Sequence, residues 1–466
     1  MLGLFGTLDL ASRSLAAQQE AMAVSGQNMA NANNPAYAEE QAVIQPATPL
    51  DTTAGQEGTG VNLVSITEIR NALLDSQITA ENSVTGSYSA QQSALQNAEA
   101  YLGEQLTNTS SGTSSPNGLA AGLSNLFNAF SSLSTNPTDT ASIQTAIQSA
   151  QQVANLFNQV SANLSQVQSG LNSSIGSDVA SSNQDLSEIA SLNQQIALAQ
   201  AAGQTADQLV DTRQATIENL AGIVNISTAA QSDGSVNISI GGVAMVTGGS
   251  AVDGLQTYTD AGGQTLVEDQ NSSTPLSITG GSIGGNITAR DGALASLQNS
   301  LNTLANQLIT SVHNIYSKGQ APNNNDSTGQ DLFTGTDASD IAVNPALVND
   351  PSQFQSSASG AAGDNSIVLA LAQLDDPTGG TPTLSQSYAQ TVSSLGSAIA
   401  TATDQLNTSQ AVSTTLTNQR TSASGVNIDQ EMTNLLQYQK AYEASAQLVT
   451  TLNTMMQTAV TMDNGG

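Results

Sequence analysis

Proton transfer and metal binding would have to rest on very few side chains in this sequence. His313 is its one histidine, and cysteine is absent. A Ser-His-Asp or Cys-His catalytic site needs an imidazole to move the proton, and a transition-metal site needs several His or Cys ligands. His313 falls in a predicted helix, where a surface or edge histidine is the usual case. We therefore expect no catalytic residues, no metal site and no cofactor.

Carboxylates are plentiful, but their placement does not resemble an active site. Asp375 and Asp376 precede Pro377 in a predicted loop, which is typical of solvated charge rather than of a general acid–base pair. No acidic stretch has the spacing of an EF-hand loop. The paired glycines between residues 241 and 285 are not followed by the lysine of a phosphate-binding loop, and strand turns explain them better. A carboxylate-only enzyme or an oxygen-ligated Ca²⁺ site remains a distant alternative.

The charge of the chain argues against two classes of partner. Its 37 acidic residues outnumber seven basic ones, so the net charge is −30. Nucleic acids and anionic membrane surfaces both require basic groups on the protein. The longest apolar run, residues 367–371, is far too short to span a bilayer. We expect no nucleic-acid partner and no membrane insertion, and self-repulsion should keep free copies soluble.

The N-terminus lacks the arrangement of a cleavable secretion signal. Residues 1–10 are apolar only briefly and include Asp9, and Arg13 follows the apolar stretch instead of preceding it. The absence of cysteine excludes a disulfide framework. By these features the chain is either cytoplasmic or exported by a route that leaves its signal uncleaved.

Long helices with apolar stripes are predicted at both ends of the chain. The first ends at Asn33-Asn34-Pro35, because proline disfavours helical geometry in the residue before it. The last spans residues 428 to about 462. A stripe of this kind needs a partner helix, so we expect the two ends to pair as a coiled coil. The first stripe consists of Leu4, Leu8, Ala11, Leu15, Gln18, Met22, Ser25 and Met29, and the second of Leu435, Tyr442, Val449 and Met456, flanked by Met432, Ala446 and Val460.

Helical patterns fill most of the sequence between the two ends. They cover residues 66–106, 119–133, 206–220, 290–317 and 384–421, and also 138–202 with an interruption near residues 170–176. Residues 46–60 are expected to be irregular or extended. Residues 236–240 alternate apolar and polar side chains after the turn signal Asp233-Gly234, which indicates β structure. The predicted fold is mainly α with a small β-rich insertion, elongated, with paired terminal helices and a long helical-bundle middle domain.

Three domains follow from this pattern. Residues 1–45 and 425–466 would form a terminal coiled-coil inner domain. Residues 46–223 and 288–424 would form a helical middle domain, and residues 224–287 a β-rich outer domain.

Motifs at both ends resemble the signatures of flagellar axial proteins, the family of rod, hook and hook-associated subunits. Residues 27–37, Gln-Asn-Met-Ala-Asn-Ala-Asn-Asn-Pro-Ala-Tyr, are similar to the N-terminal signature, although Asn34 replaces the common threonine and Ala36 the common glycine. Residues 424–432 and 435–442 are similar to the C-terminal signature. The signature positions are Asn28, Asn31, Pro35, Tyr37, Ser424 and Gly425.

Interior motifs narrow the resemblance to the hook-associated protein 1 family. They lie at residues 136–139, 192–196, 207–213, 233–242 and 332–337, in the order and spacing of that family. The resemblance implies a structural, non-enzymatic subunit of the hook–filament junction, required for filament assembly. It would be extracellular, exported by the flagellar type III apparatus without a cleaved signal.

The resemblance also implies partners and an assembly site. The partners would be copies of the chain in a ring, the hook protein, the second junction protein, and an export chaperone at the C-terminal helix. The inner coiled coil would use Leu8, Leu15, Met22, Met29, Met432, Leu435, Tyr442, Val449 and Met456.

Two other interpretations stay open at this point. Another axial subunit, hook protein or flagellin, is the nearest, although hook protein should be mostly β between its ends. A secreted adhesin or binding module is less favoured, because it would leave the apolar stripes at both ends unexplained.

Overall fold

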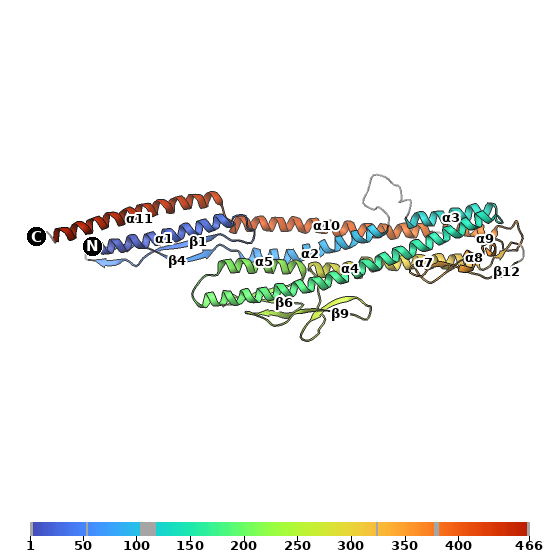
Figure 1. The fold of residues 1–466 in the computed structure, drawn as a ribbon, viewed down its shortest axis with the longest axis horizontal. Coiled ribbons are helices and arrows are strands. Elements are labelled where there is room, and N and C mark those ends of the chain that lie inside the picture. Colours follow the sequence, from blue (N-terminus) through green and yellow to red (C-terminus); the bar gives the residue numbers. More distant parts are fainter. Residues whose placement is uncertain (1–2, 53–54, 103–117, 323–324, 377–381, 464–466) are drawn as a thin grey trace.

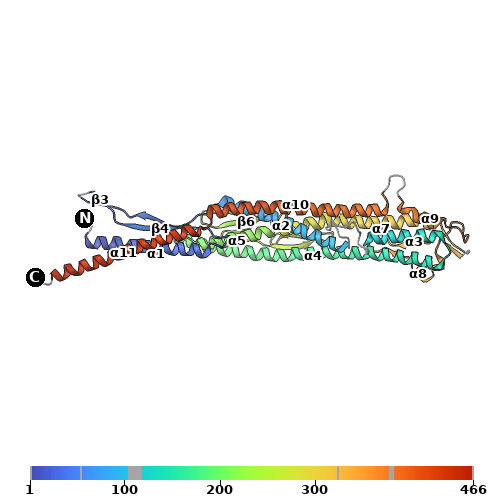
Figure 2. The same ribbon diagram turned by 90° about the horizontal axis from the view of Figure 1, so that it is seen from above.

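Helices of up to 62 residues set the shape of the molecule. The computed structural model describes residues 3–52, 55–102, 118–322, 325–376 and 382–463. Its long helices lie along a common axis, and the result is an elongated rod with both chain termini at the same end (Figures 1 and 2). The predicted fold class, mainly α with a small β-rich insertion, is confirmed. No helix in these described ranges is long and apolar enough to cross a membrane.

The larger part of the rod, here called the body, is a bundle of long helices. Leu123, Phe157, Leu308 and Leu395 lie in its apolar core, which runs along the bundle. The helices of the body are α2 (Ala72–Leu102), α3 (Leu119–Thr135), α4 (Thr140–Ala201), α5 (Asp207–Ile223), α6 (Gly281–Ala289), a π-helical turn (Arg290–Leu294), α7 (Ala295–Tyr316), α8 (Pro345–Asn349), α9 (Ser366–Ala372) and α10 (Leu384–Ser424).

Short elements complete the end of the body that lies far from the chain termini. They include two 3₁₀ turns, Pro351–Gln353 and Gln373–Asp375. Two small antiparallel pairs join β11 (Gln320–Ala321) to β12 (Asn325–Thr328), and β13 (Phe333–Thr334) to β14 (Ala342–Val343).

Helix α4 corrects one expectation. The sequence predicted an interruption near residues 170–176, but the helix is continuous. Gly170 and Gly176 each weaken a helix by about 1 kcal/mol relative to alanine. Leu171 and Ile175, between them, are buried in the two apolar clusters of the body. Tertiary packing therefore outweighs the local preference of the two glycines.

The smaller part of the rod, here called the end part, consists of two helices and a β-ribbon. The helices are α1 (Leu4–Asn31) and α11 (Ile428–Asp463). Strand β1 (Glu40–Pro46) pairs antiparallel with β4 (Val61–Glu68), and β2 (Leu50–Thr52) with β3 (Gly55–Glu57). Both strands of the longer pair contact α1.

One expectation at the β-ribbon was wrong. Residues 46–60 are irregular or extended as expected and contain the short strands β2 and β3, but the predicted helix from residue 66 begins at Ala72 instead. Asn71 explains the start of the helix, because its Oδ1 accepts hydrogen bonds from the backbone N–H of Leu73 (3.1 Å) and Leu74 (3.3 Å). A side chain that caps free N–H groups fixes where a helix starts.

The β-rich insertion lies against the side of α4. Its strands are β5 (Ser227–Ala230), β6 (Val236–Ile240), β7 (Val243–Thr247) and β8 (Ser250–Ala251), in that order in one sheet, and the separate pair β9 (Leu255–Thr259) and β10 (Thr265–Asp269). Ile238, Ile240 and Met245 pack in a second apolar cluster with Ile189 of α4 and Leu220 of α5. The insertion thus shares its core with the body, and the division into three domains stays a prediction.

Candidate assembly surface

Helices α1 and α11 lie side by side and run antiparallel, so that both chain ends reach the same tip of the rod (Figures 1 and 2). The Oγ atoms of Ser14 and Ser445 are 3.1 Å apart across the interface. The α1 residues buried most deeply are small, among them Ala11, Ala17 and Ala21. Small side chains let two helix backbones approach closely. The pair is therefore joined along an alanine-rich seam.

The nine residues expected to form the inner coiled coil lie beside this seam, whereas Ala11 and Ser25 of the first predicted stripe are buried. Met432 and Tyr442 are 52% and 37% exposed, respectively. The other members are half-buried: Leu8, Leu15, Met22, Met29, Leu435, Val449 and Met456. The terminal helices pair as expected, but the large apolar residues of the stripes flank the seam. Whether the stripe residues form an inner coiled coil with other subunits stays a prediction.

Exposed apolar side chains lie on both flanks of α11. With about 100° of rotation per residue, Met432 and Val460 lie on one side of the seam. Leu448 and Met455, with Met462, lie on the other. The helix has no charged residue from 444 to 462. A helix with a buried seam and two exposed apolar flanks can contact neighbours on both sides.

The signature residues near the N-terminus fold the chain back onto α1. Tyr37 donates its hydroxyl proton to Oδ1 of Asn28, at 2.8 Å. The same oxygen accepts the backbone N–H of Glu40 (3.0 Å), and Asn28 Nδ2 donates to the Glu40 carbonyl (2.8 Å). Burial raises the pKa of Tyr37, so its hydroxyl remains a donor at neutral pH. This contact sets the direction in which β1 leaves α1.

The remaining signature residues serve the same turn or the return of the chain from α10 to α11. Asn31 Nδ2 donates to the Gln27 carbonyl (3.1 Å), and Pro35 is exposed in the turn. The carbonyl of Ser424 accepts the backbone N–H of Glu39 (2.8 Å), which links the C-terminal signature to the segment just after the N-terminal one. A Cβ on Gly425 would lie 2.4 Å from the Thr421 carbonyl oxygen, so only glycine fits.

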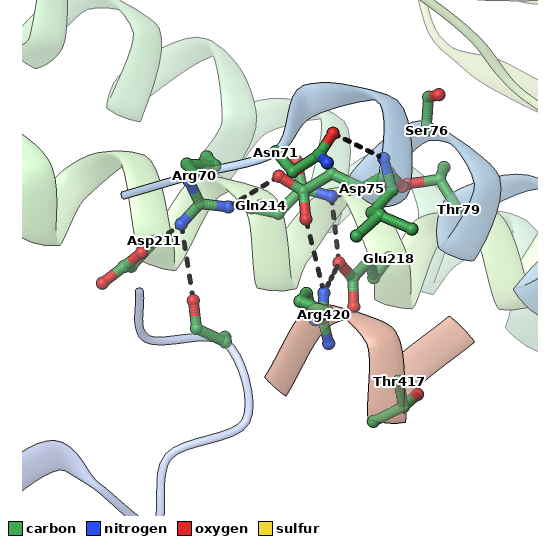
Figure 3. A network of polar contacts seen from close by, with 12 residues as sticks. Arg70, Asn71, Asp75, Ser76, Thr79, Asp211, Gln214, Glu218, Thr417 and Arg420 are labelled. Atoms are coloured by element: carbon green, nitrogen blue, oxygen red, sulfur yellow. Dashed lines mark hydrogen bonds and ion pairs between the residues drawn. The ribbon is translucent and has the colours of Figure 1, made fainter. Parts of the chain in front are cut away.

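A network of ion pairs joins the end part to the body (Figure 3). Arg70 pairs with Glu68, Asp75 and Asp211, and Arg420 pairs with Glu218 (2.5 Å) and more distantly with Asp75 (3.7 Å). Sequence reasoning missed this network. Its members are spread over 350 residues, and the one available signal was that arginine is rare in this chain.

His313 and Asp375, which the sequence offered as possible catalytic groups, make hydrogen bonds and ion pairs with nearby residues of the same chain. His313 is half exposed and pairs with Asp331. Asp375 accepts hydrogen bonds from the backbone N–H (3.1 Å) and the hydroxyl (2.7 Å) of Ser385, next to the start of α10. Among the described residues, no group of three or more His, Cys, Asp or Glu side chains could hold a metal ion.

Two family models match this chain. Residues 103–333 match the model described as "Flagellar hook-associated protein FlgK helical domain". Residues 417–462 match the model described as "Flagellar basal body rod FlgEFG protein C-terminal".

Curated relatives extend the match over nearly the whole chain. Flagellar hook-associated protein 1 of Bacillus subtilis is 27% identical, over 97% of this chain and 96% of the relative. The protein of the same name from Escherichia coli is 24% identical, over 94% and 96%. A solved structure, that of the flagellar hook junction protein FlgK from Burkholderia pseudomallei, has a TM-score of 0.48 at 23% identity, over 55% of this chain and 46% of that one.

Proposed function

The chain belongs to the flagellar hook-associated protein 1 family, and we propose that it works as a structural subunit of the junction between hook and filament. The main support for this proposal is the distribution of apolar side chains on the surface of α11. One face packs on α1 along the alanine-rich seam, and apolar side chains on both flanks face solvent. Copies of the chain arranged around an axis would bury those flanks against their neighbours.

In this arrangement the end parts form an inner layer and the bodies lie outside it. The chain assembles as a ring with other copies, with hook protein on one side and the second junction protein on the other. Burial of exposed apolar area stabilises such contacts by about 25 cal/mol per Å². Because each copy carries a charge of −30, contacts between copies should be uncharged, as residues 444–462 are.

Export and chaperone binding fit the same helix. Before assembly, the exposed side chains of Met455, Val460 and Met462 would favour aggregation. An export chaperone that covers the C-terminal helix would shield them. The chain would leave the cell through the flagellar type III apparatus, without a cleaved signal, to reach the extracellular junction.

The work of the protein is mechanical and involves no reaction. Its long helices and the two apolar clusters between them make a stiff body, which suits a part that joins a flexible hook to a stiff filament. The alternatives of hook protein or flagellin are disfavoured by the curated relatives, which are flagellar hook-associated proteins 1, and an adhesin would leave the α11 surface unexplained.

A deletion strain tests the function directly. Cells that lack this protein should build hooks without filaments and lose motility, and a copy supplied in trans should restore both. Electron microscopy of isolated hooks provides the readout. Normal filaments in the deletion strain would refute the junction function.

A further inference from the structure

The end part and the body are connected covalently at two places. Residues 69–71 lead from β4 to α2, and residues 425–427 lead from α10 to α11. Both connections are short and non-helical (Figure 1). Hinges commonly lie in such segments between rigid elements, so the chain itself would allow the end part to change its angle.

No shared apolar core fixes that angle within the described residues. The two clusters of buried apolar side chains contain members from residues 94 to 402 and none from the end part. A cavity of about 230 Å³ separates the turn at residues 31–38 from residues 420–426 at the end of α10. The relative orientation must therefore depend mainly on polar contacts.

Arg70 makes polar contacts with both the end part and the body. Its side chain is 16% exposed and lies in the first connection. Toward the end part it donates to Glu68 (2.7 Å) and to the Ala36 carbonyl (3.4 Å). Toward the body it donates to Asp75 of α2 (3.0 Å) and to Asp211 of α5 (Figure 3).

Arg420 extends the network to the second connection. It lies five residues before Gly425 and donates to Glu218 of α5 (2.5 Å). It also pairs with Asp75 at 3.7 Å, so that one carboxylate links the two arginines. In addition, Glu39 N–H donates to the Ser424 carbonyl, and Ile69 N–H donates to the Glu39 carbonyl, each at 2.8 Å.

We propose that Arg70 is a brace that holds the end part at a fixed angle to the body. A planar guanidinium with five donors can bind carboxylates on several elements at once, which an ammonium group cannot do with the same geometry. Loss of this one side chain frees the end part to move about its two connections. The end part and the body each keep their own fold. The brace is a property of the single chain and does not depend on the junction function.

Spin labels across the joint test the brace. Because the chain lacks cysteine, Thr415→Cys on α10 and Gln437→Cys on α11 give one labelled pair at exposed positions. At 1.5 Å per helical residue the two sites are on the order of 35 Å apart. Pulsed electron–electron double resonance on the purified monomer then reports the distribution of that distance.

Arg70→Gln should roughly double the width of the distance distribution while helix content and the main melting transition stay unchanged. Arg70→Lys should not restore the narrow distribution. The control is Arg13→Gln, because Arg13 pairs with Asp9 one turn away on the same exposed face of α1 (2.9 Å). It should leave the width unchanged.

A folded Arg70→Gln variant with the narrow distribution of the wild type would overturn the proposal. If that variant fails to fold, Glu68→Gln decides, since it removes the carboxylate on the end part and leaves the body's ion pairs in place. An intermediate width is expected there, and a wild-type width in that folded variant would refute the brace.

Discussion

At the scale of single residues, Asn193 and Arg213 hold the β-rich insertion to the body. Asn193 Nδ2 donates to the carbonyls of Val236 and Gly248, both at 2.8 Å, and its Oδ1 accepts from the Val236 N–H at 3.0 Å. Arg213 donates to the same Oδ1 (2.9 Å) and to the Gly234 carbonyl (2.7 Å). Two side chains on α4 and α5 thus satisfy backbone groups at the start of β6 and in the turns that precede β6 and follow β7.

Asn193→Ala should lower the stability of the insertion by about 3 kcal/mol. Asn193 is fully buried, and each buried polar group left without a partner costs about 1–3 kcal/mol. Hydrogen exchange of strands β5 to β8 should show the loss. Gln195→Ala, at an exposed site two residues away, serves as the control. Equal protection in the two variants would contradict this role for Asn193.

Asp211 should make stability depend on pH. Burial, then hydrogen bonding to Glu68 and its negative charge, raise the pKa of the Asp211 carboxyl to about 8, although Arg70 opposes the shift. The folded state therefore keeps a proton between Asp211 and Glu68 that the unfolded chain releases near pH 4, and an oxygen of Asp211 still accepts the hydrogen bond from Arg70. The stabilisation of the folded state by the protonated Asp211 carboxyl is fully present below about pH 4 and is lost as the pH rises through about 8.

Asp211→Asn should therefore remove part of the fall in stability between about pH 4 and 8. Denaturant unfolding at several pH values measures it. If the free energy of unfolding fell equally with pH in the variant and the wild type, Asp211 would not be the group responsible. The ionisable groups around Asp211 are Tyr37 from the turn before β1, Glu40 of β1, Glu68 of β4, Arg70 of the connection, Asp75 of α2, Asp207 and Arg213 of α5, and Glu431 of α11.

At the scale of elements, the two faces of α11 should respond differently to a charge. Leu448 and Met455 are 42% and 54% exposed, so Leu448→Asp or Met455→Asp should change monomer stability by less than about 0.5 kcal/mol. Within the ring an unpaired carboxylate would lose its hydration, and filaments should not form. Thr454→Asp, at an exposed position about opposite the seam residue Ser445, is the matched control. Normal filaments with either flank variant would show that this flank meets no neighbour.

The seam itself should be sensitive to size. Ala21 belongs to α1 and its side chain is fully buried. Ala21→Leu should push the paired helices apart, and overpacking typically costs about 1–3 kcal/mol. Faster hydrogen exchange in α1 and α11 would report it, with Ala23→Leu at an exposed site of α1 as the control. Unchanged exchange in both helices would argue against a tight seam. Leu435 and Val449 are half-buried beside the seam, so aspartate there should weaken the pairing within one chain as well.

At the scale of the whole molecule, the β-rich insertion should be removable without loss of the rod. The ends of the insertion lie together, because a Cβ on Gly281 would lie 2.2 Å from the backbone of Ile223. Replacing residues 226–278 with a short Gly/Ser linker should leave helix content and filament growth intact.

The same deletion should lower the melting temperature of the body, since it exposes Ile189 and Leu220. Polar substitutions at those two positions should recover part of the loss. Circular dichroism and complementation of the deletion strain provide the two measurements. A variant that folds and is exported but grows no filaments would mean that the insertion makes an essential contact.

Local patterns in the sequence were enough to predict the fold class, the terminal helices and the position of the insertion. Period-seven and period-two patterns of apolar residues report local structure, and residues 428–463 and 236–240 carry those patterns clearly. The scarcity of histidine and the absence of cysteine likewise argue against most catalytic chemistry on composition alone.

Which faces of the helices meet depends on tertiary packing and could not be predicted in this way. A stripe such as Leu8, Leu15 and Met22 shows that a helix has an apolar side, but not whether that side contacts the same chain or another one. Packing likewise carries α4 through Gly170 and Gly176, and no local pattern reports contacts made elsewhere in the chain. The brace depends on such distant contacts, because Arg70 meets Asp211 only after some 140 intervening residues have folded around them.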